Sequence, residues 1–246
     1  MIHDQSAAGS LAQLMAGRMP PRYSRNAGTI GVRGQSKLLQ AKVAVVGAGG
    51  LGGHAVELLA RLGVGHLTVI DDDCFVETNL NRQLLAGMRT LGTNKAVAAA
   101  ARVAEVNPEV CLTAVPCRLT AENALELLAG QDVIVDALDN YSSRRILLEA
   151  AQRLKVTVVY AAIAGFTGQV STVLPTDLAL RHLLQQPLPD DRGVEAALGN
   201  PATTPAVAAA LQVQEVVKWI TGTGPVLSGK LLYFDLELSL FELIDL

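Results

Sequence analysis

Two polar stretches and one lysine carry most of the chemistry that this sequence offers. The first stretch runs from Asp71 to Asp73, directly after a short apolar segment. The second consists of Thr78, Asn79, Leu80, Asn81, Arg82 and Gln83. Its guanidinium and amide groups suit phosphate and nucleoside contacts, and Lys95 adds a positive charge beyond it. Together these residue types favour binding of a phosphorylated ligand.

A glycine-rich turn precedes this polar region. Gly47, Gly49, Gly50 and Gly52 lie between an apolar segment typical of a buried strand and a segment with helical spacing. Glycines let the turn be tight and let a phosphate approach the backbone, and the following helix start offers unpaired N–H groups. Asp71 comes at the distance where a carboxylate accepts ribose hydroxyls. The pattern predicts nucleotide binding rather than only a packing turn. It leaves NAD and ATP open, and it is not a P-loop.

A second acidic position, Asp139 followed by Asn140, comes after a later apolar segment. If both segments are parallel strands, these residues meet the glycine turn at one edge of the sheet, where Asp139 could hold Mg²⁺ between phosphates. Plainer interpretations exist, with Arg82 in a surface ion pair, Lys95 solvated and Asp139 capping a helix. A dehydrogenase needs no such set around its pyrophosphate, whereas an enzyme that expels pyrophosphate does.

Alternating elements would position these residues. We predict strands at residues 42–47, 66–71, 109–116, 132–136 and 156–160, and helices at 50–63, 94–105, 120–129 and 142–154. This alternation predicts an α/β fold with a Rossmann-like, doubly wound and mostly parallel sheet.

The two ends of the chain have a different pattern. Residues 1–21 form an arm that is weakly helical at best, over 7–17, and a polar segment at 22–26 has no strong structure of its own. A short helical piece is expected around 35–40. At the other end we expect a strand at 168–174, a crossover loop at 175–201, a helix at 203–220 and two antiparallel strands within 230–246. No linker divides the chain, so residues 1–246 are interpreted as one domain.

Composition narrows the functional classes. Half of the 246 residues are apolar, 17% are charged, and the net charge is −3. There is no basic footprint for nucleic acid and no apolar run of about 18 residues. The first residues do not have the pattern of a signal peptide, so we expect a cytoplasmic protein without a membrane segment. The cysteines at 74, 111 and 117 lack CxxC spacing, so we expect reduced core or semi-core thiols rather than disulfides or zinc ligands.

Ten motifs together make the chain similar to one family. They are RYSRN (22–26), GAGGLG (47–52), GVGHLTVIDDD (63–73), TNLNRQ (78–83), NK (94–95), NP (107–108), DALDN (136–140), GQVS (168–171), TTPAVAAALQVQEVVK (203–218) and GKLLYFD (229–235). From about residue 22 to 243 the sequence resembles the ThiF/MoeB/HesA adenylyltransferases, relatives of the ubiquitin-activating enzymes.

The resemblance implies that a homodimer uses ATP and Mg²⁺ to adenylate the C-terminal carboxylate of a small ubiquitin-like sulfur-carrier protein ending in Gly-Gly. The matching ATP-binding positions are Gly50, Asp71, residues 78–82, Lys95, Asp139 and Asn140. Arg25 matches an arginine that reaches the partner subunit's triphosphate. Asp73 and Gln83 lie in the same motifs, and Asp139 is the expected magnesium ligand.

The sequence also departs from this family. Two CxxC pairs that hold a structural zinc in well-known members are missing, so no zinc is expected. No cysteine follows Cys117, and Cys74 stands beside carboxylates that disfavour a thiolate. The activity is therefore expected to stop at the acyl-adenylate. The alternatives are a non-catalytic carrier-binding protein, an enzyme that activates a tRNA-borne carboxylate and, less favoured, an NAD-dependent oxidoreductase.

Overall fold

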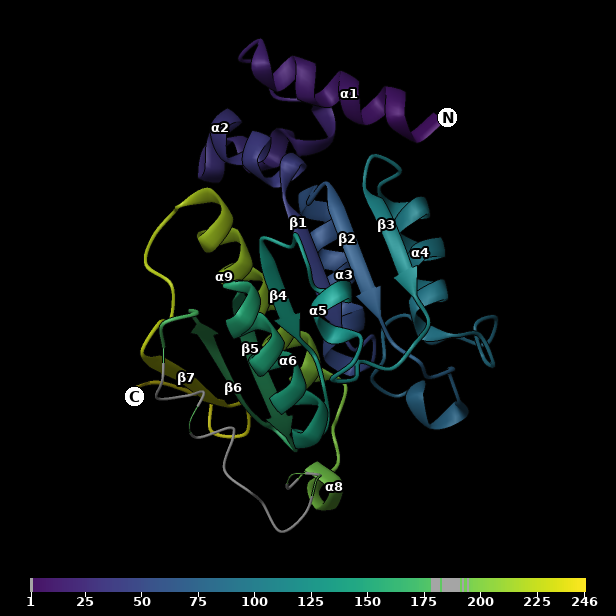
Figure 1. Cartoon of the computed structure of the whole chain (residues 1–246), viewed down its shortest axis with the longest axis vertical. Coiled ribbons are helices and arrows are strands. Elements are labelled where there is room, and N and C mark those ends of the chain that lie inside the picture. Colours follow the sequence, from purple (N-terminus) through teal and green to yellow (C-terminus); the bar gives the residue numbers. More distant parts are fainter. Residues whose placement is uncertain (1, 178–181, 183–190, 192, 194) are drawn as a thin grey trace.

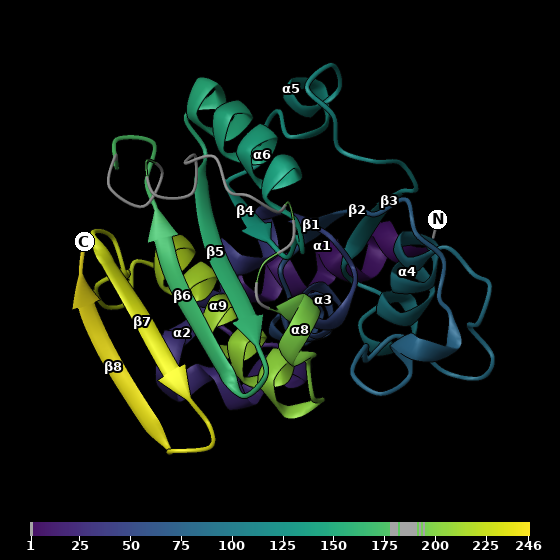
Figure 2. The same cartoon turned by 90° about the horizontal axis from the view of Figure 1, so that it is seen from below.

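One mixed sheet organises the part of the chain that the computed structural model describes, which is residues 2–177, 182, 191, 193 and 195–246. Its eight strands follow the order β3-β2-β1-β4-β5-β6-β7-β8 (Figure 1, with β8 labelled in Figure 2). The first five of these strands are parallel, and the last three are antiparallel. This confirms the predicted fold class, including the antiparallel strands in the C-terminal part.

The strand register brings three loops to one edge of the sheet. The parallel strands are β1 (Lys42–Val46), β2 (His66–Ile70), β3 (Cys111–Val115), β4 (Val133–Asp136) and β5 (Thr157–Ala164). Val46, the last residue of β1, pairs with Ile70 on one side and Asp136 on the other. The glycine turn, the acidic stretch after β2 and the loop after β4 therefore all start at the same level.

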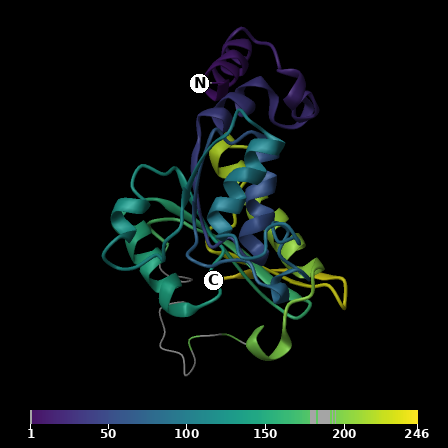
Figure 3. The ribbon, with the colours of Figure 1, turned by 90° about the vertical axis from the view of Figure 1, so that its right-hand side faces the viewer.

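Helices cover both faces of the parallel part, as Figure 3 shows along the sheet. One layer contains α3 (Gly50–Leu62), α4 (Lys95–Val106) and α9 (Thr203–Thr221). The other contains α5 (Ala124–Leu127) and α6 (Tyr141–Leu154). Two clusters of buried apolar side chains, one on each face, join the helices to the sheet. Because both faces are covered, β1 and β4 are near-continuous apolar runs.

The N-terminal region has more structure than expected. It forms α1 (Ile2–Met15), the 3₁₀ helix η1 (Pro21–Asn26) and α2 (Ala27–Gln40), which is kinked at Gly31 with φ of 64°. The expectation that residues 22–26 lack structure of their own is wrong. Tyr23 is buried, its hydroxyl donates to Glu109 Oε2 at 3.2 Å and accepts from Asn107 Nδ2 at 3.0 Å, and burial raises its pKa to about 12. A long-range anchor thus orders a segment without a helical pattern.

The C-terminal part adds antiparallel strands beside β5, as Figure 2 shows from below. They are β6 (Thr167–Val173), β7 (Lys230–Asp235) and β8 (Leu240–Asp245), and the short helix α8 (Glu195–Leu198) precedes α9. Residues 178–181, 183–190, 192 and 194 of the expected crossover loop lie outside the described residues.

Two smaller elements complete the fold. A second 3₁₀ helix, η2 (Glu77–Asn79), follows the acidic stretch. The helix expected over 120–129 is reduced to α5, because Asn123 Oδ1 accepts the Thr120 N–H at 2.8 Å and holds the first residues in a turn. Among the described helices, none combines the length and the apolar character needed to cross a membrane.

Candidate functional site

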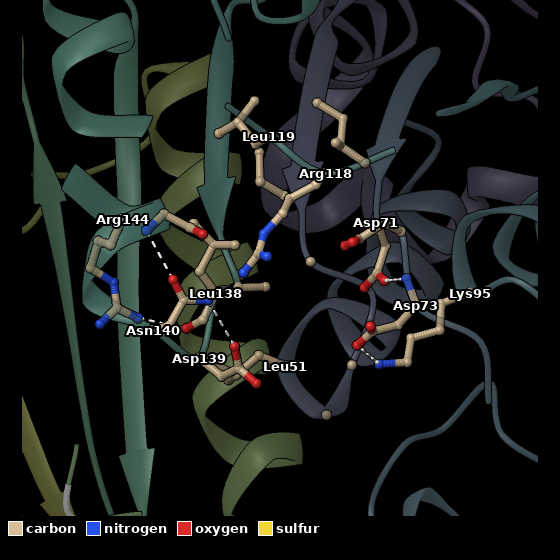
Figure 4. A pocket seen from close by; sticks show the side chains of 18 of the residues that line it. Leu51, Asp71, Asp73, Lys95, Arg118, Leu119, Leu138, Asp139, Asn140 and Arg144 are labelled. Atoms are coloured by element: carbon tan, nitrogen blue, oxygen red, sulfur yellow. Dashed lines mark hydrogen bonds and ion pairs between the residues drawn. The ribbon is translucent and has the colours of Figure 1, made fainter. Parts of the chain in front are cut away.

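A cavity of about 460 Å³ lies at the carboxyl edge of β1, β2 and β4 (Figure 4). Open α/β sheets bind their ligands at this edge. Ten of the residues singled out in the sequence line it: Gly47, Gly49, Gly50, Asp71, Asp73, Arg82, Gln83, Lys95, Asp139 and Asn140. Residues separated by up to 93 positions in the sequence (from 47 to 140) therefore share one pocket.

The glycine turn forms the pocket floor and requires glycine at two positions. Gly47 has φ of 93°, and a Cβ there would lie 2.5 Å from the carbonyl oxygen of Ala137. A Cβ on Gly52 would lie 1.8 Å from the carbonyl oxygen of Gly47. Gly52 does not line the pocket but allows α3 to start directly under the turn. The N–H groups of the first turn of α3 can therefore face a phosphate.

Asp71 ties the acidic stretch to the glycine turn. Its Oδ2 accepts the Ala48 N–H at 2.6 Å, and its Oδ1 accepts the Asp73 N–H at 2.8 Å. Burial raises the pKa of the Asp71 carboxyl, and the Ala48 N–H and the Lys95 charge act in the opposite direction. Each carboxylate oxygen keeps a lone pair, so Asp71 can still accept two ribose hydroxyls.

Lys95 is a buried cation on the β2 side of the site, with 6% of its surface exposed. Asn94 caps α4 by accepting the Val97 N–H at 3.1 Å, which places Lys95 at the helix start. The Lys95 ammonium donates to Asp73 Oδ2 at 2.9 Å, and Figure 4 shows this pair on the β2 side of the pocket. Asp73 therefore orients the ammonium. The interpretation of Lys95 as a solvated helix residue is wrong, because its side chain is enclosed.

The stretch from 78 to 81 positions Arg82 rather than lining the pocket. The Arg82 Nη1 donates to the Thr78 carbonyl oxygen at 3.1 Å and to Asn81 Oδ1 at 3.0 Å. Asn79 is buried and accepts the Val76 N–H at 3.0 Å, while Leu80 is half-buried. Among the described residues Arg82 forms no ion pair. The structure therefore does not support the alternative in which Arg82 belongs to a surface ion pair.

On the β4 side, Asn140 and Asp139 have separate roles. Asn140 is the N-cap of α6 and accepts the Ser143 N–H at 2.9 Å. The alternative in which Asp139 caps this helix is therefore wrong. Asp139 is exposed on the pocket wall, and its Oδ1 accepts the Asn140 amide N–H at 3.2 Å. Exposed carboxylate oxygens suit Mg²⁺, which prefers oxygen ligands and keeps several waters.

A buried ion pair fixes the backbone under this wall. Arg144 Nε donates to Asp136 Oδ2 at 2.8 Å, and Arg144 Nη2 donates to the Leu138 carbonyl oxygen at 2.7 Å. The guanidinium also lies over the Tyr160 ring, 5.0 Å from its centroid. Arg144 lines the pocket but was not identified from the sequence. The signal was its spacing of one helical turn from Asn140, on the face turned toward β4.

Other wall residues were also missed. Cys117, Arg118 and Leu119 follow β3, and Figure 4 shows the Arg118 side chain reaching into the pocket. Asn200, between α8 and α9, lines it as well. The signal for the residues after β3 was their position beyond a strand end at the same edge. Asn200 had no such signal, because it lies far along the chain in a segment without a motif.

The cysteines are free thiols but do not belong to the core. Cys74 and Cys111 are exposed, and Cys117 is half-buried on the pocket wall. The expectation of core or semi-core thiols is therefore wrong for Cys74 and Cys111. The reason is that Cys111 lies on the outermost parallel strand and Cys74 in the loop after β2, where its backbone bridges to Asn94.

The acidic stretch after β2 brings three carboxylates together. The carboxylates of Asp71, Asp72 and Asp73 have oxygens within 4.8 Å of one another, but hydrogen bonds already hold Asp71 and Asp73.

Arg25 is exposed and lies in η1. Two other residues of this 3₁₀ helix, Arg22 and Tyr23, bond to Val106 and Glu109, which come just before β3. Arg25 is not part of its own chain's pocket. A five-residue strand of about 16 Å separates the two edges.

The fold and this pocket define a Rossmann-like α/β protein with a glycine turn of the phosphate-binding type. More particularly, the chain belongs to the ThiF family, whose model matches residues 23–246.

This chain aligns with two relatives over most of the length of those relatives. The chain is 38% identical to the SAMP-activating enzyme E1 of Haloferax volcanii, over 91% of this chain and 84% of that protein. It is also 38% identical to the sulfur carrier protein adenylyltransferase of Thermus thermophilus, over 87% and 82%. A crystal structure of E. coli MccB with ATP shares the fold, with a TM-score of 0.76 and 23% identity over 92% of this chain and 71% of that one.

Proposed function

We propose that this protein binds ATP with Mg²⁺ and adenylates the C-terminal carboxylate of a small ubiquitin-like sulfur-carrier protein, releasing pyrophosphate. The observation that carries the proposal is the convergence of the glycine turn, Lys95, Arg82 and Asp139 around one cavity. The names of the two relatives, a SAMP-activating enzyme and a sulfur carrier adenylyltransferase, support this substrate class. They favour neither the NAD-dependent oxidoreductase nor the tRNA alternative.

In the proposed reaction a carboxylate oxygen of the carrier attacks the α-phosphorus of ATP, and the bond from that phosphorus to the leaving pyrophosphate breaks. The substrate carboxylate is ionised at neutral pH, so no general base is needed. The protein must align the carboxylate and stabilise charge on pyrophosphate. Lys95 and Arg82 would donate to the phosphates, and Asp71 would accept the ribose hydroxyls.

Asp139, with its exposed carboxylate, would hold the Mg²⁺ that neutralises the phosphates. Lys95 would keep its contact with Asp73 while it binds a phosphate oxygen, because an ammonium has three N–H donors. Asn140 would act on the site by ending the loop that carries Asp139.

We further propose that residues 1–246 act as one adenylation domain within a homodimer in which Arg25 reaches the partner subunit's pocket. The position of Arg25 at the amino edge of the sheet, on an anchored 3₁₀ helix, supports action across an interface, since its own pocket is at the opposite edge. Mixing Arg25→Ala with Asp139→Ala protein tests this idea. Subunit exchange should restore part of the activity, because one site of each mixed dimer has both groups intact. No recovery after confirmed exchange would contradict it.

Pyrophosphate exchange tests the function itself. Labelled pyrophosphate should enter ATP only when Mg²⁺ and a ubiquitin-like carrier ending in Gly-Gly are both present. The control is the same carrier without its last glycine pair. Exchange that needs only a free small acid, or ATP binding without exchange for any carrier, would refute the proposed substrate or the proposed activity.

A further inference from the structure

Two amide side chains on the pocket wall have a buried oxygen atom without a hydrogen bond. They are Gln83, whose Oε1 accepts no hydrogen bond from the described residues, and Asn200, whose Oδ1 likewise has none. Gln83 is 6% exposed. Leaving a buried polar atom unpaired destabilises a protein, and such atoms are rare in native proteins. Gln131 and Gln212 also have an unpaired buried oxygen among the described residues. Of these four amides, Gln83 and Asn200 are the two in the pocket wall, where a bound ligand can supply a donor.

The backbone around Asn200 is anchored from two sides, so its position in the pocket is defined. The Gly165 N–H donates to the Gly199 carbonyl oxygen at 2.8 Å, which joins the segment to the turn between β5 and β6. The Asn81 amide donates to the Asn200 carbonyl oxygen at 3.3 Å. Figure 2 shows α8, which ends just before this segment, beside the end of β5. The backbone at Asn200 is therefore held between the β5–β6 turn and the loop that carries Asn81.

Gln83 lies next to the phosphate-binding turn. A Cβ on Gly49 would be 3.6 Å from its amide nitrogen. The start of α9 reaches the same place, because a Cβ on Gly50 would be 3.4 Å from Pro205. Gln83 and the start of α9 therefore both lie at the glycine turn, and the Asn200 backbone is joined through Asn81 to the loop that carries Gln83.

The chemistry of an amide identifies the ligand group. Phosphate oxygens only accept hydrogen bonds, so they cannot pair an amide oxygen. A neutral amide offers one donor end and one acceptor end, which complements a peptide group with its N–H and carbonyl. In the proposed reaction that group belongs to the acyl substrate. A backbone-only contact of this kind suits a glycine tail, because no side chain has to be accommodated between two walls.

We propose that Asn200 and Gln83 bind the peptide groups of the carrier's terminal residues and so position its carboxylate for attack. This inference rests on the proposed function. Asn200 is the sharper probe, because Gln83 also stands beside the nucleotide. The Asn200→Leu substitution keeps a similar side-chain size and removes both hydrogen-bonding groups.

The test measures steady-state pyrophosphate exchange with the recombinant Gly-Gly-terminated carrier that supports exchange by the wild-type protein. Asn200→Leu should raise KM for the carrier about tenfold and change KM for ATP less than about twofold. Its melting temperature should stay equal or rise, because an unpaired buried oxygen has been removed. A purely structural asparagine would instead lower the melting temperature and leave the KM for the carrier unchanged.

Gln131→Leu is the matched control. Gln131 also has an unpaired buried oxygen, but it precedes β4 at the amino edge of the sheet and does not line the pocket. This variant should leave both KM values unchanged. If Asn200→Leu prevents folding, Asn200→Ala is measured in the same way. An unchanged KM for the carrier, or an equal rise in KM for ATP, would overturn the inference. Absence of carrier-dependent exchange in the wild-type protein would instead refute the proposed function.

Discussion

The two sides of the pocket use charge in different ways. On the β2 side, Lys95 pairs with Asp73, whose side chain is 69% exposed, so the ammonium can turn toward a ligand at small cost. On the β4 side, Arg144 and Asp136 are both buried, with side-chain exposures of 5% and 0%, and the guanidinium also holds the Leu138 carbonyl. The first pair presents a charge to the pocket, whereas the second fixes the backbone that carries Asp139.

This difference shows that an ion pair near a site can serve binding or architecture according to its burial. A partly exposed pair contributes little to stability, so its charge remains available for a ligand. A buried pair is costly to break, because the remaining charge is left without a partner in a medium of low dielectric constant. Variants on the two sides should therefore separate loss of activity from loss of stability.

The largest effect on activity is expected for Asp139→Ala. If this carboxylate holds Mg²⁺, its loss leaves the phosphates without their bridging cation, and exchange should fall by about 10³-fold or more. Unfolding in urea should be nearly unchanged, because Asn140 and not Asp139 caps α6. Glu149→Ala, on the exposed side of the same helix, is the control. Near-wild-type exchange in Asp139→Ala would show that the magnesium ligand is another residue.

Lys95→Met should lower exchange by about 10²–10³-fold while changing the free energy of unfolding by less than about 1 kcal/mol. The methionine retains the apolar stem that is buried at the start of α4 and loses only the ammonium. Exchange kinetics and urea unfolding measured on the same preparation would check both values. A large loss of stability would mean that Lys95, like Arg144, is architectural.

Arg144→Met should show the opposite balance, with a loss of about 3–5 kcal/mol in the free energy of unfolding, because Asp136 is left buried and charged. Adding Asp136→Asn should recover part of this loss. Urea unfolding of the two single variants and the double variant measures the coupling directly. Strictly additive effects would contradict the assignment of this pair as the anchor of the β4 side.

A smaller effect should appear in the pH dependence. Asp71 must be ionised to accept two ribose hydroxyls, and burial raises its pKa above the ordinary value. The kcat/KM for ATP should therefore begin to fall at a higher pH than an ordinary aspartate carboxyl would produce as the pH is lowered. The free energy of unfolding should change in the opposite direction and rise as the pH is lowered. The reason is that a raised pKa in the folded state makes protonation favour that state. Asp71→Asn should abolish this pH dependence, and a profile unchanged in that variant would exclude Asp71 as its source.

The smallest effect is expected for replacement of all three cysteines. The Cys74/Cys111/Cys117→Ser protein should keep exchange within about twofold, since adenylation needs no thiol nucleophile. Elemental analysis of the wild-type protein should find no stoichiometric zinc, since three separated cysteines do not make a tetrahedral site. Loss of exchange in the folded Cys117→Ser protein would assign a role to the thiol on the pocket wall.

The sequence alone determined the parallel half of the fold and most of the pocket on its β1 and β2 sides. The reason is that these features are local: a buried strand, its glycine turn and the acidic residue at the next strand end are read from short stretches. Gly47, Asp71 and Asp139 were placed at one edge by the rule that parallel strands end together, and the register of β1 with β2 and β4 confirmed it.

Only the tertiary structure decided the rest. Tyr23 orders the N-terminal arm through Asn107 and Glu109, contacts that no local pattern contains. The buried Asp136–Arg144 pair and the position of Asn200 also depend on long-range packing, since an isolated Arg or Asn is normally a surface residue. A side chain's burial and partners are set by elements distant in the chain. For this reason the sequence identified many of the polar groups that line the pocket, whereas the structure revealed those that hold the backbone and complete the pocket wall.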